Sequence, residues 1–545
     1  MIHALKHPSL FRPTSRPTSP APAPLTRNDA STAMERSRPL NKLSFSTFRR
    51  PSPMTPSAPP APAPVLLVQD GSYLEALSLK LSDAVSKALA QPAGPAAANE
   101  HVGGKRPIPS GRGRALGTLI ISELKATREN PHLHRAIIRS LHRPLSVLLS
   151  NLSALLLPLI SSPAFLSPPA PSVQAPTPNA TQLHALAIAT FAGELLLSFD
   201  EIRLGVDSDA RGDGLKAIRE GLVSLVGRVA NPLIAGVKAE LMPLIEALEK
   251  PVSVTVPKAS KSGPVLHPSI TSLQALMPIY ARAMGRYTLS LPSQTTLATF
   301  LISVIWRALV ALSHRPRAPP SPPTSPPSSP LLAPVMSRRQ RASSGNTVSG
   351  GTPPITPPSL RFGIKLPPSR PPSPPSVTVS STPAADAMAL YDLLLLMPRP
   401  ALDNDATRVA REAVDEAYAD LKALAILLES ADSPLFKLNK SPEQLLEDLD
   451  ALSADLPTLI ALPVLLRSHV FGPETGAGLA PSVAVLLDVP ENDYRRGCLA
   501  GFGRAEECAN VVGQGILDVL HEQADGAATN CVTKWLEGRV GAIEH

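Results

Sequence analysis

Proline is concentrated in two segments of this chain, and its distribution constrains what the chain can fold into. Residues 1–64 hold 14 of the 64 prolines, and residues 315–385 hold 20. Proline fixes φ and removes a backbone donor, and few large apolar side chains accompany it here to offset the entropy of ordering. We therefore expect both segments to be disordered, and packed structure to be confined to residues 65–314 and 386–545.

The same two segments carry the positive charge of the chain. Residues 1–64 have nine basic and two acidic side chains, and residues 315–385 have eight basic side chains and no acidic one. The chain as a whole is +8, so the remainder is −7. This distribution disfavours a basic globular nucleic-acid-binding domain, and no specific nucleic-acid partner is expected.

The number of cysteines and the residues at the start of the sequence indicate the expected cellular location. Three cysteines in 545 residues exclude a disulfide-stapled secreted scaffold, so an intracellular protein, cytoplasmic or nuclear, is expected. The start is rich in arginine and has no acidic residue before Asp29, as in a mitochondrial transit peptide. Prolines at 8, 13, 17 and 20 oppose the long amphipathic helix of such a peptide, so the mitochondrial alternative is the less favoured one.

Helical periodicity dominates both ordered regions. Apolar residues from Leu215 to Leu248 recur at steps of three and four, with charged residues between them, and similar patterns follow Leu74 and Ala410. Sustained period-two alternation is missing, so the expected class is all-α: an irregular helical bundle or an α-solenoid-like array in two ordered regions. Internal loops are expected at about 91–114 and 163–180.

Three capping patterns predict where helices begin. Ser72 with Glu75 has the spacing of a capping box, and Ser441 with Gln444 has it too, with Pro442 at the first helical position. Asn404 or Asp405 can cap the helix whose apolar face starts at Ala410.

The C-terminal region contains the cysteines and several glycines, which are residue types found in metal, nucleophile and phosphate sites. Cys498, Cys508, His521 and Cys531 are too widely spaced for a compact zinc site, so no metal and no cofactor are predicted. A nucleophilic pair of Cys498 with His469 or His521 stays an open alternative, although no local sequence motif supports it. The glycines at 497, 501 and 503 fit turns or close helix packing better than a phosphate cradle. His521-Glu522 has Asp525 where a zincin motif needs a second histidine.

Residues 144–193 contain no Asp, Glu, Lys or Arg, and Leu145–Leu166 is long enough to span a bilayer. Asn151, Pro158, Pro163 and several serines interrupt it, so a helix buried in protein is favoured over a membrane span.

The proline-rich segments contain the clearest sequence motifs in the chain, which are motifs for binding and modification by other proteins. Lys365, Pro368 and Pro371 fit a basic-x-x-Pro-x-x-Pro ligand for an SH3-type groove, because such a segment is preformed polyproline II. Ser344 follows Arg339 and Arg341, as in sites of basophilic kinases. Residues followed by proline are candidate sites for proline-directed kinases: Ser19, Ser52, Thr55, Ser321, Ser325, Ser329, Thr352, Thr356, Ser373 and Thr382.

Three functional hypotheses follow, and no reaction is predicted. The first is a non-enzymatic helical scaffold or adaptor with a phosphorylatable proline-rich linker, whose partners are proteins such as SH3-type domains and proline-directed kinases. The second is a membrane-associated helical protein held by residues 144–193. The third is an enzyme that uses the C-terminal Cys/Gly-rich region. The absence of a catalytic constellation makes a non-enzymatic role the favoured one, and the sequence leaves the oligomeric state open.

Overall fold

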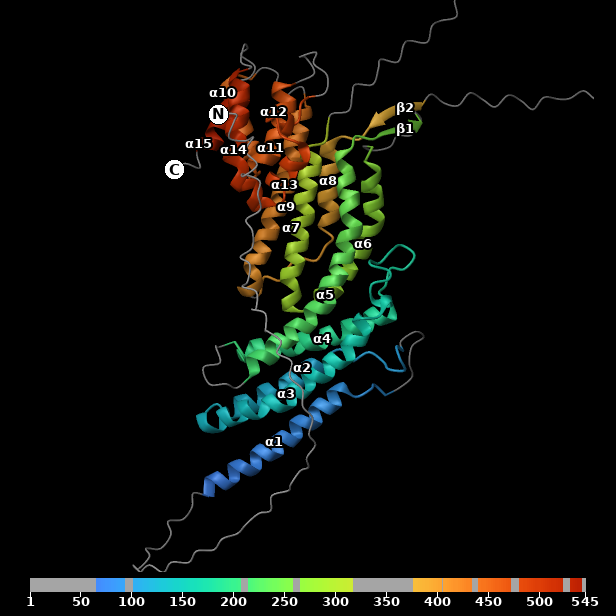
Figure 1. Ribbon diagram of the computed structural model, residues 1–545, viewed down its shortest axis with the longest axis vertical. Coiled ribbons are helices and arrows are strands. Elements are labelled where there is room, and N and C mark those ends of the chain that lie inside the picture. The colour runs from blue at the N-terminus through green and yellow to red at the C-terminus, as the bar shows by residue number, and fades with distance from the viewer. Residues whose placement is uncertain are drawn as a thin grey trace, which may run out of the picture.

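The computed structural model describes residues 65–93, 101–206, 214–257, 265–316, 376–403, 405–433, 440–471, 480–522 and 530–541. These residues form an elongated, mostly helical body (Figure 1). The predicted arm 1–64 and residues 317–375 of the predicted linker lie outside the described residues. The SH3-type ligand at Lys365, Pro368 and Pro371 and all predicted phosphorylation sites except Thr382 lie outside them too.

One end of the body is a stack of helices (Figure 1). α1 packs on α3, α2 packs on α4, and both α3 and α4 pack on α5. The elements of this end are α1 (Val65–Leu89), α2 (Arg112–Ala126), α3 (Pro131–Ile160), the short 3-10 helix η2 (Pro163–Phe165), α4 (Ala180–Glu201) and α5 (Leu215–Glu246).

Long helices form the middle of the body, and α5 connects them to the stack (Figure 1). α7 packs against both α5 and α9, while α8 packs against α6 and α9. The middle elements are η3 (Ala247–Glu249), α6 (Pro268–Tyr287), α7 (Leu291–Ser313), α8 (Pro383–Leu394) and α9 (Asp405–Asp432). A two-stranded antiparallel ribbon lies beside them: β1 (Ser253–Pro257) pairs with β2 (Ser376–Ser380), with Ser253 opposite Ser380.

The other end is a cluster of shorter helices from the C-terminal part of the chain (Figure 1). α15 packs on α10 and α14, and α11 packs on α14, α7 and α9. The elements are α10 (Pro442–Ser453), α11 (Thr458–Leu465), the π-helical turn η5 (Leu466–Val470), α12 (Val483–Leu486), α13 (Glu491–Cys498), α14 (Phe502–Glu522) and α15 (Asn530–Gly541).

The two ordered regions predicted from the sequence share one hydrophobic core. α7, from the first region, buries Leu301, Val304 and Leu309 completely, and it packs on α9 of the second region. The indole of Trp306 in α7 donates a hydrogen bond to the carbonyl oxygen of Leu499, 2.8 Å away. The core runs without interruption from Leu77 to Leu536, so the described regions form a single folded body.

The predicted fold class and helix faces are confirmed. The chain is all-α, and the apolar stripe from Leu215 to Leu248 is buried at almost every position. The α9 face is also buried at Val414, Leu421 and Leu424. The predicted capping box is present at α10: Ser441 Oγ accepts from the Gln444 N–H, and Gln444 Oε1 accepts from the Ser441 N–H, each at 3.2 Å.

Several local predictions need correction. α1 begins at Val65, so Ser72 lies inside the helix and does not cap it. The internal prolines of α3 and α5 predict that each helix is broken or kinked, but neither is split. Both run through their prolines as single helices, because packing on their neighbours outweighs the lost hydrogen bonds. The short ribbon escaped prediction although its strands, SVTVP and SVTVS, alternate polar and apolar residues. Each run is only five residues long, and β2 lies in the segment whose proline content predicts disorder.

The predicted boundaries of the linker, 315 and 385, also need correction. Arg315 is 2% exposed, residues 376–380 form β2, and α8 begins at Pro383. Composition alone could not show this, because the contacts that order both ends come from distant parts of the chain.

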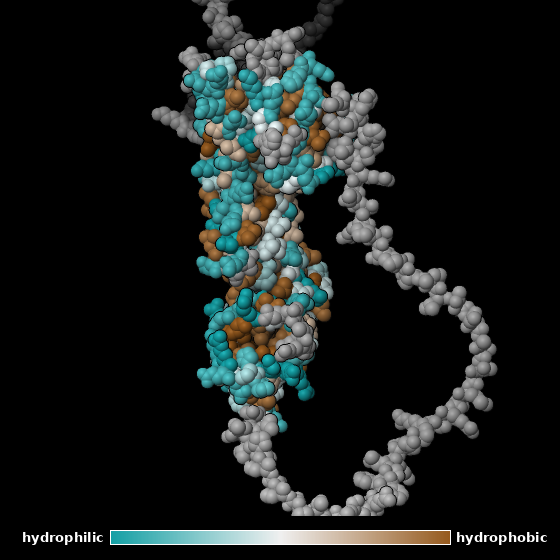
Figure 2. Space-filling model, turned by 90° about the vertical axis from the view of Figure 1, so that its left-hand side faces the viewer, coloured by the Kyte–Doolittle hydropathy of each residue, from teal (hydrophilic) through white to brown (hydrophobic). Residues whose placement is uncertain are grey.

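Four described helices are long and apolar enough to cross a membrane by length and composition: α3, α4, α5 with η3, and α7. The most apolar window of α3 is 28% buried in the protein, whereas that of α4 is 72% buried. Leu145, Leu148, Leu152 and Leu156 form the buried face of α3. Figure 2 shows apolar surface scattered among hydrophilic residues along one side of the body, including a compact patch in the half that contains α1–α5.

Candidate functional site

The two ends of the proline-rich segment are held at one place on the body by a buried ion pair. Arg315, two residues after α7, donates from Nη1 to Asp386 Oδ2 and from Nη2 to Ser381 Oγ, the latter at 2.8 Å. Asp386 lies in the first turn of α8 and is fully buried. Its other oxygen accepts the backbone N–H of His267 at 2.8 Å. We call Arg315, Ser381 and Asp386 the segment anchor.

His267 supports the anchor from the start of α6. Its Nδ1 accepts the Ser269 N–H at 3.1 Å, and its Nε2 lies 3.2 Å from the carbonyl oxygen of Lys250, which only a protonated nitrogen can bond. Burial lowers the pKa of His267, and the positive charge of Arg315 lowers it further. The ring is therefore neutral at physiological pH, with its proton on Nε2.

Thr382 is the one predicted phosphorylation site within the described residues, and it lies next to the anchor. It caps α8, with its Oγ1 accepting the Ala385 N–H at 3.3 Å, and its side chain is exposed. Thr382 also lines a cavity of about 310 Å³ together with Arg315 and Arg467. An added phosphate here would face a helix N-terminus, which favours negative charge.

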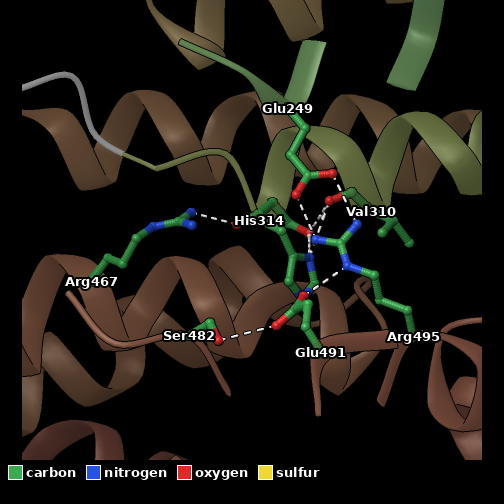
Figure 3. Close-up of polar contacts among 8 residues, drawn as sticks. Glu249, Val310, His314, Arg467, Ser482, Glu491 and Arg495 are labelled. Carbon is green, nitrogen blue, oxygen red and sulfur yellow. Dashed lines mark hydrogen bonds and ion pairs between the residues drawn. The ribbon is translucent and has the colours of Figure 1, made fainter. Parts of the chain in front are cut away.

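A second polar cluster joins the middle of the body to the C-terminal helices (Figure 3). Arg495 of α13 forms a bidentate pair with Glu249 of η3, with Nη1 to Oε2 at 2.9 Å, and its Nε donates to Glu491 at 2.7 Å. Glu491 also accepts from Ser482 Oγ at 3.1 Å. A bidentate arginine–carboxylate pair fixes orientation as well as distance, so this cluster sets how α13 lies against η3.

His314 lies between this cluster and Arg467 (Figure 3). Burial lowers the pKa of His314 to about 3, and the charges of Arg495 and Arg467 contribute. Its Nδ1 lies 3.1 Å from the carbonyl oxygen of Val310, so the proton sits on Nδ1, and the buried Nε2 has no hydrogen-bond partner among the described residues. Arg467 donates to the carbonyl oxygen of Ser313, and burial lowers its pKa to about 10. These groups hold the end of α7 and do not form a proton-transfer pair.

The predicted cysteine and histidine residues do not come together as a site. Cys498 and Cys531 are buried, Cys508 is half-buried, and all three are free thiols. Burial raises the pKa of Cys498 to about 12, with Cys508 adding to the shift, so the thiol stays protonated. His521 is exposed on α14, with Nε2 3.4 Å from Glu537. Within the described ranges, no group of three His, Cys, Asp or Glu side chains could hold a metal ion.

Comparison of the chain with protein-family models, curated proteins and solved structures finds no match. The function is therefore inferred from the geometry of this chain alone. Sequence reasoning missed the segment anchor because Arg315 and Asp386 are 71 positions apart. The only available signal was that Asp386 is the first acidic residue after a long basic stretch.

Proposed function

We propose that the protein is a non-enzymatic helical scaffold or adaptor that presents residues 317–375 to protein partners as a loop with both ends fixed on one folded body. The segment anchor supports this proposal. Arg315 and Asp386 lie on either side of the segment and are paired out of solvent, and β2 begins where the segment ends. A segment tethered twice to one body does not serve as a spacer between independent domains.

The chemistry of the segment indicates the kind of partner. Residues 317–375 contain seven basic residues and no acidic one, together with the SH3-type ligand at Lys365, Pro368 and Pro371. Six of its serines and threonines precede proline. Six phosphates would add about −9 to −12 charges, enough to reverse the sign of the segment. We propose that proline-directed kinases regulate its binding in this way, in the cytoplasm or nucleus.

The test measures binding of the full chain to purified SH3 domains that select a basic residue followed by two prolines. We expect Pro368→Ala with Pro371→Ala to weaken binding about tenfold or more, since both prolines fill the groove. The matched control is Pro354→Ala with Pro358→Ala in the same segment, which should bind like the wild type. Phosphorylation by a proline-directed kinase should weaken binding of the wild type, and a variant with the six serines and threonines changed to alanine should be insensitive.

Equal binding by both double-proline variants contradicts the ligand assignment. If phosphorylation leaves binding unchanged at low salt, where charge effects are largest, the regulatory part of the proposal fails.

A membrane-associated protein is the second candidate, and one observation favours it. α3 is long and apolar enough to span a bilayer, and its most apolar window is only 28% buried. Exposed side chains on it include Val147 at 50% and Leu157 at 49%. An enzyme that uses the C-terminal cysteines receives no such support, because the Cys498 thiol stays protonated.

A further inference from the structure

A cavity of about 720 Å³ lies in the C-terminal half of the body, away from the segment anchor. α9 forms one wall, the turn between α10 and α11 forms another, and the first turns of α14 close a third. Its size falls within the range of pockets that hold small organic ligands, about 300–1,000 Å³.

The lining combines small apolar side chains with an excess of carboxylates. Phe502 and several alanines supply the apolar surface. One basic side chain, Arg539, reaches the cavity, and its guanidinium is already engaged by Ser453 and by the ring of Trp535. The carboxylates in the lining are Glu416, Asp420, Asp455 and Glu506.

Asp420 distinguishes this cavity from an ordinary acidic surface. It is 5% exposed, and its carboxylate has no hydrogen bond or ion pair with any residue that the structure describes. Glu416, Asp455 and Glu506 are exposed at the rim. Buried carboxylates in proteins are normally paired, because an unpaired buried charge is costly. An unpaired, largely buried carboxylate that lines a cavity therefore favours a cationic ligand.

The protonation of Asp420 fits this interpretation. Burial raises the pKa of Asp420 to about 7, and the neighbouring charges of Glu416 and Asp455 contribute. Glu506 of α14 adds a further negative charge to the lining, and Arg539 of α15 is the one positive group among the described lining residues. A carboxyl near half-ionisation at neutral pH loses its proton when a cation binds beside it.

The described residues also restrict the kind of cation. Among the described residues, no group of three or more His, Cys, Asp or Glu side chains is arranged to hold a metal ion. An organic ammonium group needs only one or two carboxylates, and methylene groups suit the alanine-lined walls. Four carboxylates in one cavity favour a ligand with several ammonium groups over a simple monoamine.

We propose that this cavity binds an aliphatic polyamine, with Asp420 accepting one buried ammonium group, the rim carboxylates accepting the others, and the apolar lining contacting the methylene chain. This site is independent of the proposed scaffold role, since it shares no residue with the segment anchor or with residues 317–375.

The test is isothermal titration of the full chain with spermidine at pH 7 and low salt. We expect one saturable site, and we expect Asp420→Asn to weaken it about tenfold or more, the loss typical of a hydrogen bond to a charged group. The matched control is Glu429→Gln, which removes one charge from an exposed position of the same helix outside the cavity. It should change affinity less than twofold.

Two further measurements separate a built site from general attraction to an acidic surface. Titration in buffers of different ionisation enthalpy should show proton release on binding to the wild type and much less for Asp420→Asn. The neutral probe 1,8-octanediol should not bind. Absence of saturable binding overturns the proposal, as does equal weakening by Asp420→Asn and Glu429→Gln. Butylamine that binds as tightly as spermidine overturns the polyamine assignment.

Discussion

Among single residues, Arg315 and Asp386 of the segment anchor form a buried ion pair whose loss should destabilise the fold. The side chains of Arg315 and Asp386 are 1% and 0% exposed. Removing one partner leaves the other charge buried and uncompensated. We expect Asp386→Ala to lower the free energy of unfolding by about 3–5 kcal/mol, measured by urea denaturation.

The exposed pair of Arg408 and Glu412, 3.9 Å apart on α9, provides the comparison. Glu412→Ala should have no measurable effect, because solvent screens exposed pairs. Similar losses from the two variants would show that the anchor pair is not buried in solution.

A second prediction about a single residue concerns Asp420 and the pH dependence of the free energy of unfolding. Its pKa in the folded protein, about 7, lies above the ordinary 3.8, so the folded state holds a proton that the unfolded state releases. The contribution of Asp420 to the free energy of unfolding should therefore fall as pH rises from about 4 to 7. Asp420→Asn should lack this contribution and be more stable than the wild type at pH 8 by on the order of a few kcal/mol, since each pKa unit corresponds to about 1.36 kcal/mol. A parallel pH dependence in both proteins would contradict the assignment.

Among the helices, α3 distinguishes the two candidate functions, because the scaffold needs α3 packed in protein and the membrane-associated function needs it in lipid. Its inward face packs on α1 and α5, while Ser150 and Asn151 are exposed on the outward face. Polar groups at mid-membrane are unfavourable, so we expect the full chain to leave the membrane pellet under alkaline carbonate extraction. Retention in the pellet would favour the membrane-associated function over the scaffold.

The elements also show which features a sequence can predict. Helix faces such as that of α5 follow from periodicity, because burial of one stripe is a local property of the pattern. The cap at Ser441 is equally local, since both of its hydrogen bonds lie within four residues. The anchor and the acidic cavity were not predictable in this way, because residues far apart in sequence form them. Asp420 gave one weak signal: it is a carboxylate next to Leu421, in the apolar face of α9.

For the molecule as a whole, the shared core determines whether the fragments stay together after the chain is cleaved. The sequence predicts that limited proteolysis cuts residues 1–64 and 315–385 first and leaves two resistant fragments, because proline-rich segments of low apolar content do not pack. The structure adds that the fragments contact each other through α7 with α9, α6 with α8, and α7 with α11. Arg495 with Glu249, and Trp306 with Leu499, connect them further.

We therefore expect the cut protein to remain one particle. After cleavage within 317–375, the two fragments should elute together in size-exclusion chromatography under native conditions and separate only in denaturant. Asp386→Ala is the informative variant, because it breaks one of the contacts between the fragments, and its cut form should separate at a lower urea concentration than the wild type. Glu412→Ala should behave like the wild type, since its pair lies within one fragment. Fragments that separate without denaturant would show that the regions before and after residues 317–375 are independent domains, and the segment would then be a linker between them.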